Sequence, residues 1–449
     1  MLELLFWLFL IEILAIFLFP LAFRIFPALP DRGWSLIKPL ALLLFGYGVW
    51  LIGLSGILPN SRWSVSIVLL IFISLFWLFG KGSWKELLNH FKLQAPILIF
   101  GELIFLAFFL TWAGIRASLP EIVHTEQPMD FMFLNAVIVS PNYPPNDPWL
   151  AGQSVSYYYF GYLIFGALAL LSGIASSVVY NLAIATIAGL SAQTAFGLIA
   201  NLIRIGKGTP LAANMAGLVT TFLLLVASNL AGGLYILKSA GIGGEQFWNW
   251  IGISGFEHHD TGVLGWFPTA EGWWWWPASR VLPGTITEFP HFSLLIGDLH
   301  PHLMSLPFLL LIFGFGLQIF TSRNLAAFSE IRAGMPILVL GALVAGALAA
   351  INMWDLPIGL IIIGGSLMIR TDEITAGHEV IQRKRIGWCS LLGIGFVGSA
   401  LSAFVLGVGS VVSAILLLSV GSIAIIKARV IGGHNTTLIA AVLTLGSLA

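Results

Sequence analysis

Charge and cysteine are both scarce in this sequence. Only 9% of the residues are charged, against about a quarter in a soluble globular protein, and 58% are hydrophobic. Acidic and basic residues balance to a net charge of zero, so no basic surface argues for a nucleic-acid partner. The single cysteine, Cys389, excludes an internal disulfide and a cysteine-built metal site. These shortages are typical of a protein that lies in the membrane.

Several common motifs are also missing. The sequence contains no Walker-type phosphate loop, no GxGxxG that opens a helix after a predicted strand, and no GxSxG nucleophile elbow. Residues 2–23 are too long, and with Glu3 and Glu12 too acidic, for a cleavable signal peptide. They are predicted to form the first membrane span instead.

Apolar runs of the length needed to cross a bilayer recur along the chain, and lipid favours helices for such runs. They cover residues 2–23, 39–58, 64–80, 95–115, 157–174, 176–203, 211–237, 293–320, 334–352, 356–369, 388–407, 410–426 and 436–449. We therefore expect an all-α, polytopic membrane protein of about 12–13 spanning helices, with one integral membrane domain over residues 1–449. The carboxyl end stops inside an apolar run, as in a truncated chain.

Basic residues mark alternate connections between these runs, which the positive-inside rule assigns to the cytoplasm. They are Arg24, Arg32, Lys38, Lys81, Lys85, Lys92, Arg204, Lys207, Arg323, Arg332, Arg370, Arg383, Lys384, Arg385, Lys427 and Arg429. This pattern places the amino terminus and two large loops, about 116–156 and 238–292, on the non-cytoplasmic face of the cell membrane. The short turn at 352–355 falls on the same face.

The stretch between residues 157 and 203 does not fit this alternation. Arg204 and Lys207 belong inside, which requires an odd number of crossings before them, whereas hydropathy gives two. The stretch therefore holds either one span plus a membrane-lying segment, or three short spans.

The first large loop carries acids in two settings. Glu126 and Asp130 are four residues apart, so they project on the same side if this segment is helical. They are candidates for general acid–base or metal chemistry, and the alternative for Asp130 is a helix-capping or first-turn acid. Asp147 lies among prolines in "NYPPNDPWLAG" and is predicted to form an Asx-type turn.

The second large loop carries aromatic and basic residues in its second half. Trp273–Trp276 predict an aromatic belt at the membrane interface, or a stacking platform for a sugar or lipid head. Arg280 follows directly and suits a phosphate group through a bidentate contact. Its alternative is snorkelling, or pairing with Glu288.

The predicted span that follows this loop contains "GDLHPH", which places Asp298, His300 and His302 near the exterior end of an apolar span. Ionisable groups at that depth are costly and normally functional. Carboxylate and imidazole together suit Mg, Mn or Zn, so these three residues are a candidate divalent-metal site. The alternative is a capping aspartate followed by two interfacial histidines.

Two further features are predicted to lie on the membrane face that carries the two large loops, and a third lies within the spans. In "AAINMWDLPIGL", Asn352 and Asp355 either cap the next helix or complete a polar rim on the loop face. The consecutive Tyr157–Tyr159 favour the interface, yet on a helix they fan too widely for all to face lipid, so at least one should point inward as a substrate contact. Charged residues within the spans, the usual mark of ion coupling, are scarce, which disfavours a transporter, and Glu12 and Glu102 are the main candidates.

The segments "MDFMFLNAV…PPNDPWLAGQSVSYYYFGYL", "WWWWPASRVLPG…TEFPHFSLLIGDLHPHLMSLPF" and "NMWDLP" resemble the signature blocks of the YYY membrane protein family. The resemblance covers about residues 95–360. That family resembles, more distantly, the GT-C membrane glycosyltransferases, in which an acid of the first exterior loop acts near a sugar carried on polyprenyl phosphate. The paired acids of that loop are adjacent in GT-C enzymes, whereas Gln127, Pro128 and Met129 separate them here.

The GT-C resemblance implies a glycosyltransferase at the exterior face. Asp130 would be the general base, Glu126 its assistant, and Arg280 the holder of the donor phosphate. Asp298, His300 and His302 would bind Mg or Mn, with the tyrosines, Glu288, Asn352 and Asp355 contacting substrate. The competing hypothesis is a transporter, lipid flippase, or glycan- or lipid-binding scaffold. The enzyme hypothesis requires Asp130, Arg280, Asp298 and His302 to approach one cavity that is open to both lipid and exterior water.

Overall fold

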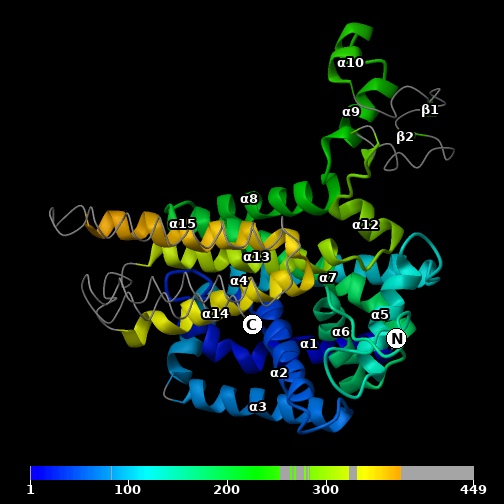
Figure 1. Cartoon of the computed structure of the whole chain (residues 1–449). Coiled ribbons are helices and arrows are strands. Elements are labelled where there is room, and N and C mark those ends of the chain that lie inside the picture. The colour runs from blue at the N-terminus through cyan, green and yellow to red at the C-terminus, as the bar shows by residue number, and fades with distance from the viewer. Residues whose placement is uncertain are drawn as a thin grey trace.

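The computed structural model describes residues 2–81, 83–252, 263–264, 267–268, 278–279, 282, 284–322 and 331–375. Three predicted spans, 388–407, 410–426 and 436–449, lie outside the described residues, as do Trp273–Trp276 and Arg280. The described chain is a bundle of helices (Figure 1).

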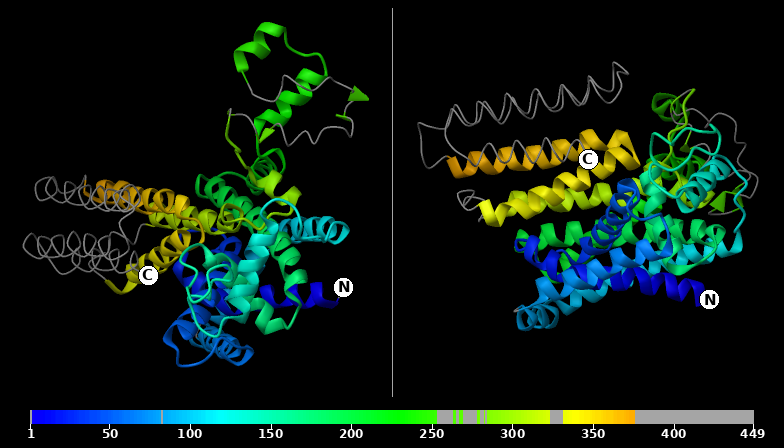
Figure 2. Two further views of the ribbon diagram at one scale, coloured as in Figure 1. Left: turned by 45° about the vertical axis from the view of Figure 1, so that its right-hand side comes forward. Right: turned by 60° about the horizontal axis from the view of Figure 1, so that its bottom comes forward.

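Seven helices of the described chain are long and apolar enough to cross a membrane, which confirms the predicted polytopic, all-α class. They are α1 (Leu2–Ile25), α2 (Ile37–Ser55) with the preceding 3₁₀ turn η1 (Trp34–Leu36), α3 (Arg62–Gly80), α4 (Trp84–Ser118), α7 (Ser176–Ile205), α8 (Pro210–Phe222) continued by the π-helix η2 (Leu223–Ala227), and α13 (Pro301–Thr321). Figure 2 shows the long helices running side by side.

Shorter elements complete the described chain. They are α5 (Gln127–Val139), α6 (Tyr159–Ser172), α9 (Leu230–Ser239), α10 (Glu245–Ile251), α12 (Pro290–Ile296), α14 (Ile331–Ile351), the 3₁₀ turn η4 (Met353–Asp355) and α15 (Leu356–Thr375). The two-residue strands β1 (Val263–Leu264) and β2 (Phe267–Pro268) pair in antiparallel orientation. Helices α9 and α10 stand away from the bundle (Figure 1).

Helix α7 is the buried centre of the bundle and packs antiparallel to α4. Two hydrogen bonds fix this direction. Arg116 near the end of α4 donates to Asn181 near the start of α7, whereas Glu102, earlier in α4, accepts from Gln193, later in α7. Between them Gly189 brings the two backbones together, because a Cβ there would lie 3.0 Å from the carbonyl oxygen of Phe105. A residue without a side chain is what allows this close approach.

One end of the bundle, which we call the loop end, gathers the turns 56–61, 119–126, 140–158, 297–300 and 352–355. Hydrogen bonds tie these turns to one another across long sequence separations. The backbone N–H of Asn60 donates to the carbonyl of Pro141 at 2.6 Å, and that of Met353 donates to the hydroxyl of Tyr157 at 2.8 Å. The loop end therefore brings together the segments in which the sequence places its candidate site residues.

The opposite end collects the basic turns. The Arg24 guanidinium donates to the Ser83 hydroxyl at 3.0 Å, so the turn after α1 meets the turn between α3 and α4. The N–H of Asp31 donates to Asn201 of α7, next to Arg204. The structure therefore separates the basic turns from the loop end, as the alternating charges predict.

Helix α6 explains the stretch that broke the alternation. Tyr157, just before α6, contacts the turn at Met353, and the carbonyl of Leu171, near its end, accepts a bond from Arg62 at the start of α3. Both ends of α6 thus lie at the loop end. Of the two alternatives, these contacts favour one spanning helix, α7, preceded by a segment whose two ends lie on the same side.

Two of the predicted continuous spans are interrupted. Residues 293–320 are split between α12 and α13, because Gly297 adopts the left-handed region (φ 73°) and ends α12. Residues 211–237 are split between α8 and α9 after the π-helix, where Ser228 has φ 48°. Hydropathy averages over such breaks, since the flanking residues remain apolar.

The close approach of α4 and α7 is tested by Gly189→Val. The added side chain must displace the Phe105 ring and backbone, so we expect a loss of about 1–3 kcal/mol of stability. Thermal unfolding in nanodiscs measures the change. The matched control is Gly114→Val on the same helix pair, because nothing lies within 4 Å of a Cβ at Gly114. Equal midpoints for the two variants would contradict the packing described.

Candidate active site

Acidic and imidazole side chains from two distant segments meet at the loop end. The first segment is the start of α5, which contributes Glu126 and Asp130, and the second runs from 288 to 302 around the break between α12 and α13. The second segment contributes Glu288, Asp298, His300 and His302. The six side chains form two connected groups, one open to the surface and one buried.

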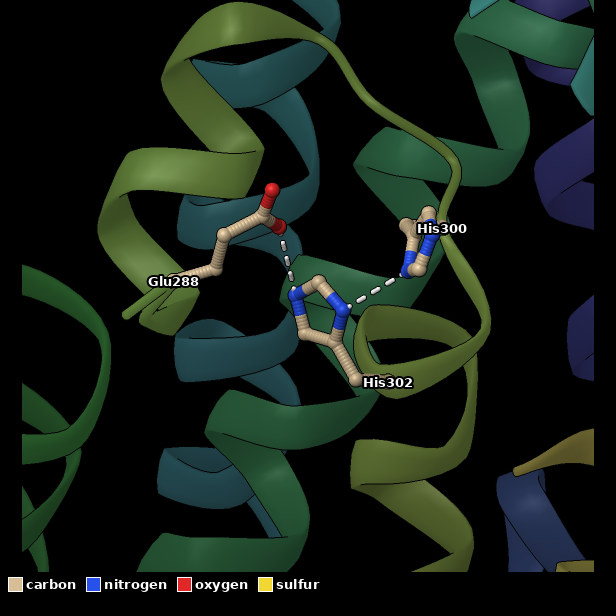
Figure 3. Close-up of side chains that lie close together, drawn as sticks. All are labelled: Glu288, His300 and His302. Carbon is tan, nitrogen blue, oxygen red and sulfur yellow. Dashed lines mark hydrogen bonds and ion pairs between the residues drawn. The ribbon is translucent and has the colours of Figure 1, made fainter. Parts of the chain in front are cut away.

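The open group is a chain of four side chains. His300 Nε2 lies 2.8 Å from Glu126 Oε2, and the Nδ1 atoms of His300 and His302 are 2.9 Å apart. His302 Nε2 lies 3.2 Å from Glu288 Oε2, as Figure 3 shows for the last three members. The Glu126 side chain is 57% exposed, the most open of the four.

The four side chains of the open group have too few protons of their own for all of their contacts. Its three contacts each need one proton between the two atoms, but two neutral imidazoles supply only two. The Ser293 hydroxyl, 2.9 Å from His302 Nε2, can supply a third proton to this imidazole, and a further proton or a cation would complete the contact between His302 and Glu288. Burial, followed by the charge of Asp298, raises the pKa of Glu288, and the Ser293 hydroxyl donates to Glu288 at 3.1 Å. Burial and the neighbouring His300 disfavour a charged His302, so a further proton in this group would lie on Glu288 rather than on His302.

A metal ion is one such cation. Glu288, His300 and His302 each offer a ligand atom, and these atoms lie within 4.8 Å of one another. One carboxylate and two imidazoles are a donor set that suits borderline divalent ions. The sequence groups Asp298 with the two histidines, but the structure gives Glu288 as the third member of this group. Asp298 follows the left-handed Gly297, and its carboxyl turns towards Asp130 instead.

The buried group is the pair formed by Asp130 and Asp298, whose exposed fractions are 0% and 1%. The Tyr162 hydroxyl donates to Asp130 Oδ1. Among the described residues, Asp130 Oδ2 and Asp298 Oδ1 are buried without a donor, which is costly for two carboxylates but is resolved by a proton shared between them. Burial, helped by Asp298, raises the pKa of Asp130 to about 9.

Residues that the sequence did not single out hold this arrangement in place. Gln127 is fully buried: its Oε1 accepts from the N–H groups of Val123 and His124, and its Nε2 donates to the carbonyl of Ile296. It thereby joins the first loop to the end of α12. A polar residue at the start of an apolar helix carries no distinctive pattern, so the sequence offers no signal for this role.

Arg116 has a similar role at the end of α4. It is 4% exposed, and its guanidinium donates to Asn181 at 2.7 Å and to the carbonyl of Glu121 at 3.1 Å. Its side chain lies against Gly297, where a Cβ would come within 2.1 Å of Arg116 Nη1. A signal existed in the sequence, since Arg116 is a basic residue at the end of a span that the charge rule assigns to the exterior.

The three consecutive tyrosines are all partly buried. The hydroxyl of Tyr157 accepts from the N–H of Met353, and that of Tyr159 accepts from Trp50 Nε1 at 2.8 Å. Tyr158 has φ 41° and packs its ring on Phe133 of α5, 5.3 Å between centroids. The tyrosine that reaches an acid is the fourth, Tyr162, one turn into α6.

Two other predicted positions have clear places. The carboxyl of Asp355 accepts from the Ser305 hydroxyl and from Asn352 Nδ2, at 3.0 Å for the latter, so it links α13 to the turn before α15. Asp147 accepts from the N–H groups of Trp149 and Leu150, which is the predicted Asx turn. Asp355 and Asn352 thus lie at the loop end beside His302, whose carbonyl also accepts from Ser305 at 3.0 Å.

The sequence matches a family described as "Uncharacterized membrane protein (DUF2298)" over residues 44–448. This match covers most of the chain and includes every residue of the two groups above. The chain belongs to this family. No curated protein and no solved structure matches the sequence. Membership agrees with the multi-pass helical architecture, and the chemistry of the loop end rests on its geometry alone.

The shared proton predicts a pH dependence that Asp130→Asn removes. The folded protein holds this proton up to about pH 9, whereas the unfolded chain loses it near the ordinary value of 3.8. The wild-type protein therefore loses stability as pH rises through that window. The asparagine can accept from Tyr162 and donate to Asp298, so its stability relative to wild type should rise by several degrees of unfolding midpoint across the window.

Thermal unfolding at a series of pH values measures this difference. Asp147→Asn is the control, because Asp147 is a turn-forming acid outside the buried pair. Parallel wild-type and Asp130→Asn curves between about pH 4 and about pH 9 would show that no proton is shared.

The candidate metal ligands predict binding of one Mn²⁺, which electron paramagnetic resonance detects directly. His302→Gln removes one of the three donor atoms, so we expect affinity to fall by more than about 100-fold, the upper range for loss of an outer-shell partner. His124→Gln is the matched control, since His124 lies in the same region and is exposed. Unchanged Mn²⁺ binding in the His302 variant would exclude the site.

Proposed function

We propose that the protein is a membrane glycosyltransferase that transfers a sugar from a polyprenyl-phosphate donor to an acceptor hydroxyl at the loop end. The observation that carries the proposal is the meeting of four carboxyl groups and two imidazoles at one end of a bundle that is otherwise poor in charge. Ionisable groups at such a depth are expensive to keep and are normally functional.

The distribution of basic residues supports the side on which this reaction would occur. Arg24 and Lys81 lie at the end opposite the site, together with Arg204 and Lys207. Under the positive-inside rule that end faces the cytoplasm, so the proposed reaction takes place on the non-cytoplasmic face. A donor carried on polyprenyl phosphate would reach the site from within the bilayer.

Glu126 is the carboxylate best placed to act as general base in this proposal. It is exposed, and its contact with His300 orients it. As the acceptor oxygen bonds to the anomeric carbon of the sugar, Glu126 takes the hydroxyl proton. The bond between that carbon and the phosphate oxygen breaks, and polyprenyl phosphate leaves with the bonding electrons.

Asp130, which the family resemblance suggests as the base, acts through its neighbours in this proposal. Its side chain is fully buried and has no access to an acceptor. Paired with Asp298 and bound by Tyr162, Asp130 fixes the turn 297–300, which includes His300. It is therefore assigned a positioning role beneath Glu126.

The donor phosphate needs positive charge nearby. Glu288, His300 and His302 would hold a divalent cation, which would neutralise the developing charge on the leaving phosphate. Arg280, expected to contact the same phosphate, lies outside the described residues and keeps that role as a prediction. Tyr157–Tyr159, Asn352 and Asp355 would form the polar and aromatic rim on which the sugar lies.

A different observation favours the non-enzymatic alternative of a transporter, lipid flippase or scaffold. Glu12, Lys38 and Glu102 form a cluster within the spanning helices, and ion-coupled transporters use charged groups at that depth. Such a protein would bind a lipid-linked sugar without converting it. Turnover therefore separates the two functions.

The test is a screen of purified protein in nanodiscs against radiolabelled polyprenyl-phosphate sugars, with and without EDTA. We expect transfer or slow hydrolysis of one donor, and a loss of about 10²–10⁴-fold in rate for Glu126→Gln, the range that a general base contributes. Glu121→Gln is the matched control, because Glu121 is an exposed acid of the same loop outside the two groups. Donor binding without turnover in the wild type would support the alternative, and equal rates for both variants would remove Glu126 from the reaction.

A further inference from the structure

A second cluster of ionisable side chains lies inside the bundle, away from the loop end. It joins four helices: Glu12 of α1, Lys38 of α2, Glu102 of α4 and Gln193 of α7. Glu12 is ten residues into α1, roughly 15 Å along its axis, and Glu102 is near the middle of α4. The proposed sugar transfer makes no use of these residues.

Lys38 is the centre of this cluster and is 1% exposed. Its Nζ lies 2.5 Å from Glu102 Oε2 and 3.3 Å from Glu12 Oε2. The Phe105 ring lies 4.6 Å from the same Nζ, and the Trp34 ring 6.0 Å from it. Among the described residues the charged groups that face one another here are therefore two carboxyls and one ammonium.

This inventory does not balance if every group is ionised. Two carboxylates and one ammonium leave a net charge of −1 among apolar helices, where an uncompensated charge is costly. Donors are short as well: the buried Gln193 gives its Nε2 to Glu102 at 2.8 Å, and its Oε1 has no donor among the described residues. One additional proton supplies the missing charge.

The contacts indicate which carboxyl carries that proton. Glu102 has the closer contact with Lys38 and accepts a second bond from Gln193, so both of its oxygens are bound as in a carboxylate. Glu12 has the longer contact with Lys38, through one oxygen. Glu102 is therefore the ionised partner of Lys38.

We propose that Glu12, Lys38, Glu102 and Gln193 form a proton-binding site within the spanning helices, with the bound proton on Glu12. The site takes up one proton from water and releases it as such, with no covalent change elsewhere. It is distinct from the proposed transferase site, because the two share no residue and lie on different parts of the helices.

Infrared difference spectroscopy of the protein in nanodiscs at neutral pH tests the proposal, through the C=O stretching band of protonated carboxyl groups. Glu12→Gln should lose the intensity of one carboxyl. Glu102→Gln should lose the same amount, because Glu12 then becomes the only partner of Lys38 and ionises. Lys38→Met should gain the intensity of one carboxyl, since both acids then become neutral.

Glu3→Gln is the matched control, an exposed acid on the same helix, and should leave the band unchanged. An unchanged band in Glu12→Gln would overturn the proposal, as would a band that responds to sodium concentration rather than to pH. If Lys38→Met fails to fold, the two glutamine variants still decide the matter. Loss of turnover plays no part in these readouts, so failure here leaves the proposed transferase activity standing.

Discussion

Backbone groups shielded from water must find partners within the protein, and the break between α12 and α13 is where this constraint is most demanding. Two side chains from other helices meet it. Tyr180 of α7 accepts from the N–H of Leu299 at 3.1 Å and donates to the carbonyl of Gly297 at 3.3 Å, while Gln127 binds the carbonyl of Ile296. Only because the break is supported in this way can Asp298 and His300 leave the helix and face the first loop.

The two polar groups of the bundle obey the same rule at different depths. At the loop end, carboxyl groups outnumber the positive charges available, and Asp130 and Asp298 are reconciled by a shared proton. Around Lys38, two acids share one ammonium. In both places burial makes the uncompensated charge too costly, so protons or cations become part of the structure. The charge balance of each group, more than any single contact, therefore indicates that the group binds a proton or a cation.

Much of the architecture was predictable, because hydropathy follows directly from the need to match the bilayer. The starts of α1, α2, α3 and α7 fall within two residues of the predicted spans. The break at Gly297 was not predictable, since a left-handed glycine between apolar neighbours leaves hydropathy unchanged. The sequence allows two paths for residues 157–174, and only the contacts with Arg62 and Met353 decide between them.

The sequence indicates which residues belong to the candidate site, but not which of them contact one another. The sequence points to Glu126, Asp130, Asp298, His300 and His302 because acids and histidines are rare in this chain. It does not indicate that Glu288 joins the two histidines or that Asp298 turns to Asp130, because these pairings depend on where α12 ends. Arg116 illustrates the opposite case, in which a basic residue on the unexpected side of a span was visible in the sequence.

The bond between Gln127 and Ile296 joins residues separated by 169 positions. During synthesis, α5 and the acids of its first turn emerge long before the segment that completes them. Asp130 is therefore synthesised well before its partner Asp298 and lacks that partner until the segment around 298 has been made. A nascent chain halted before residue 290 would carry Asp130 without Asp298 and Gln127 without its bond to Ile296.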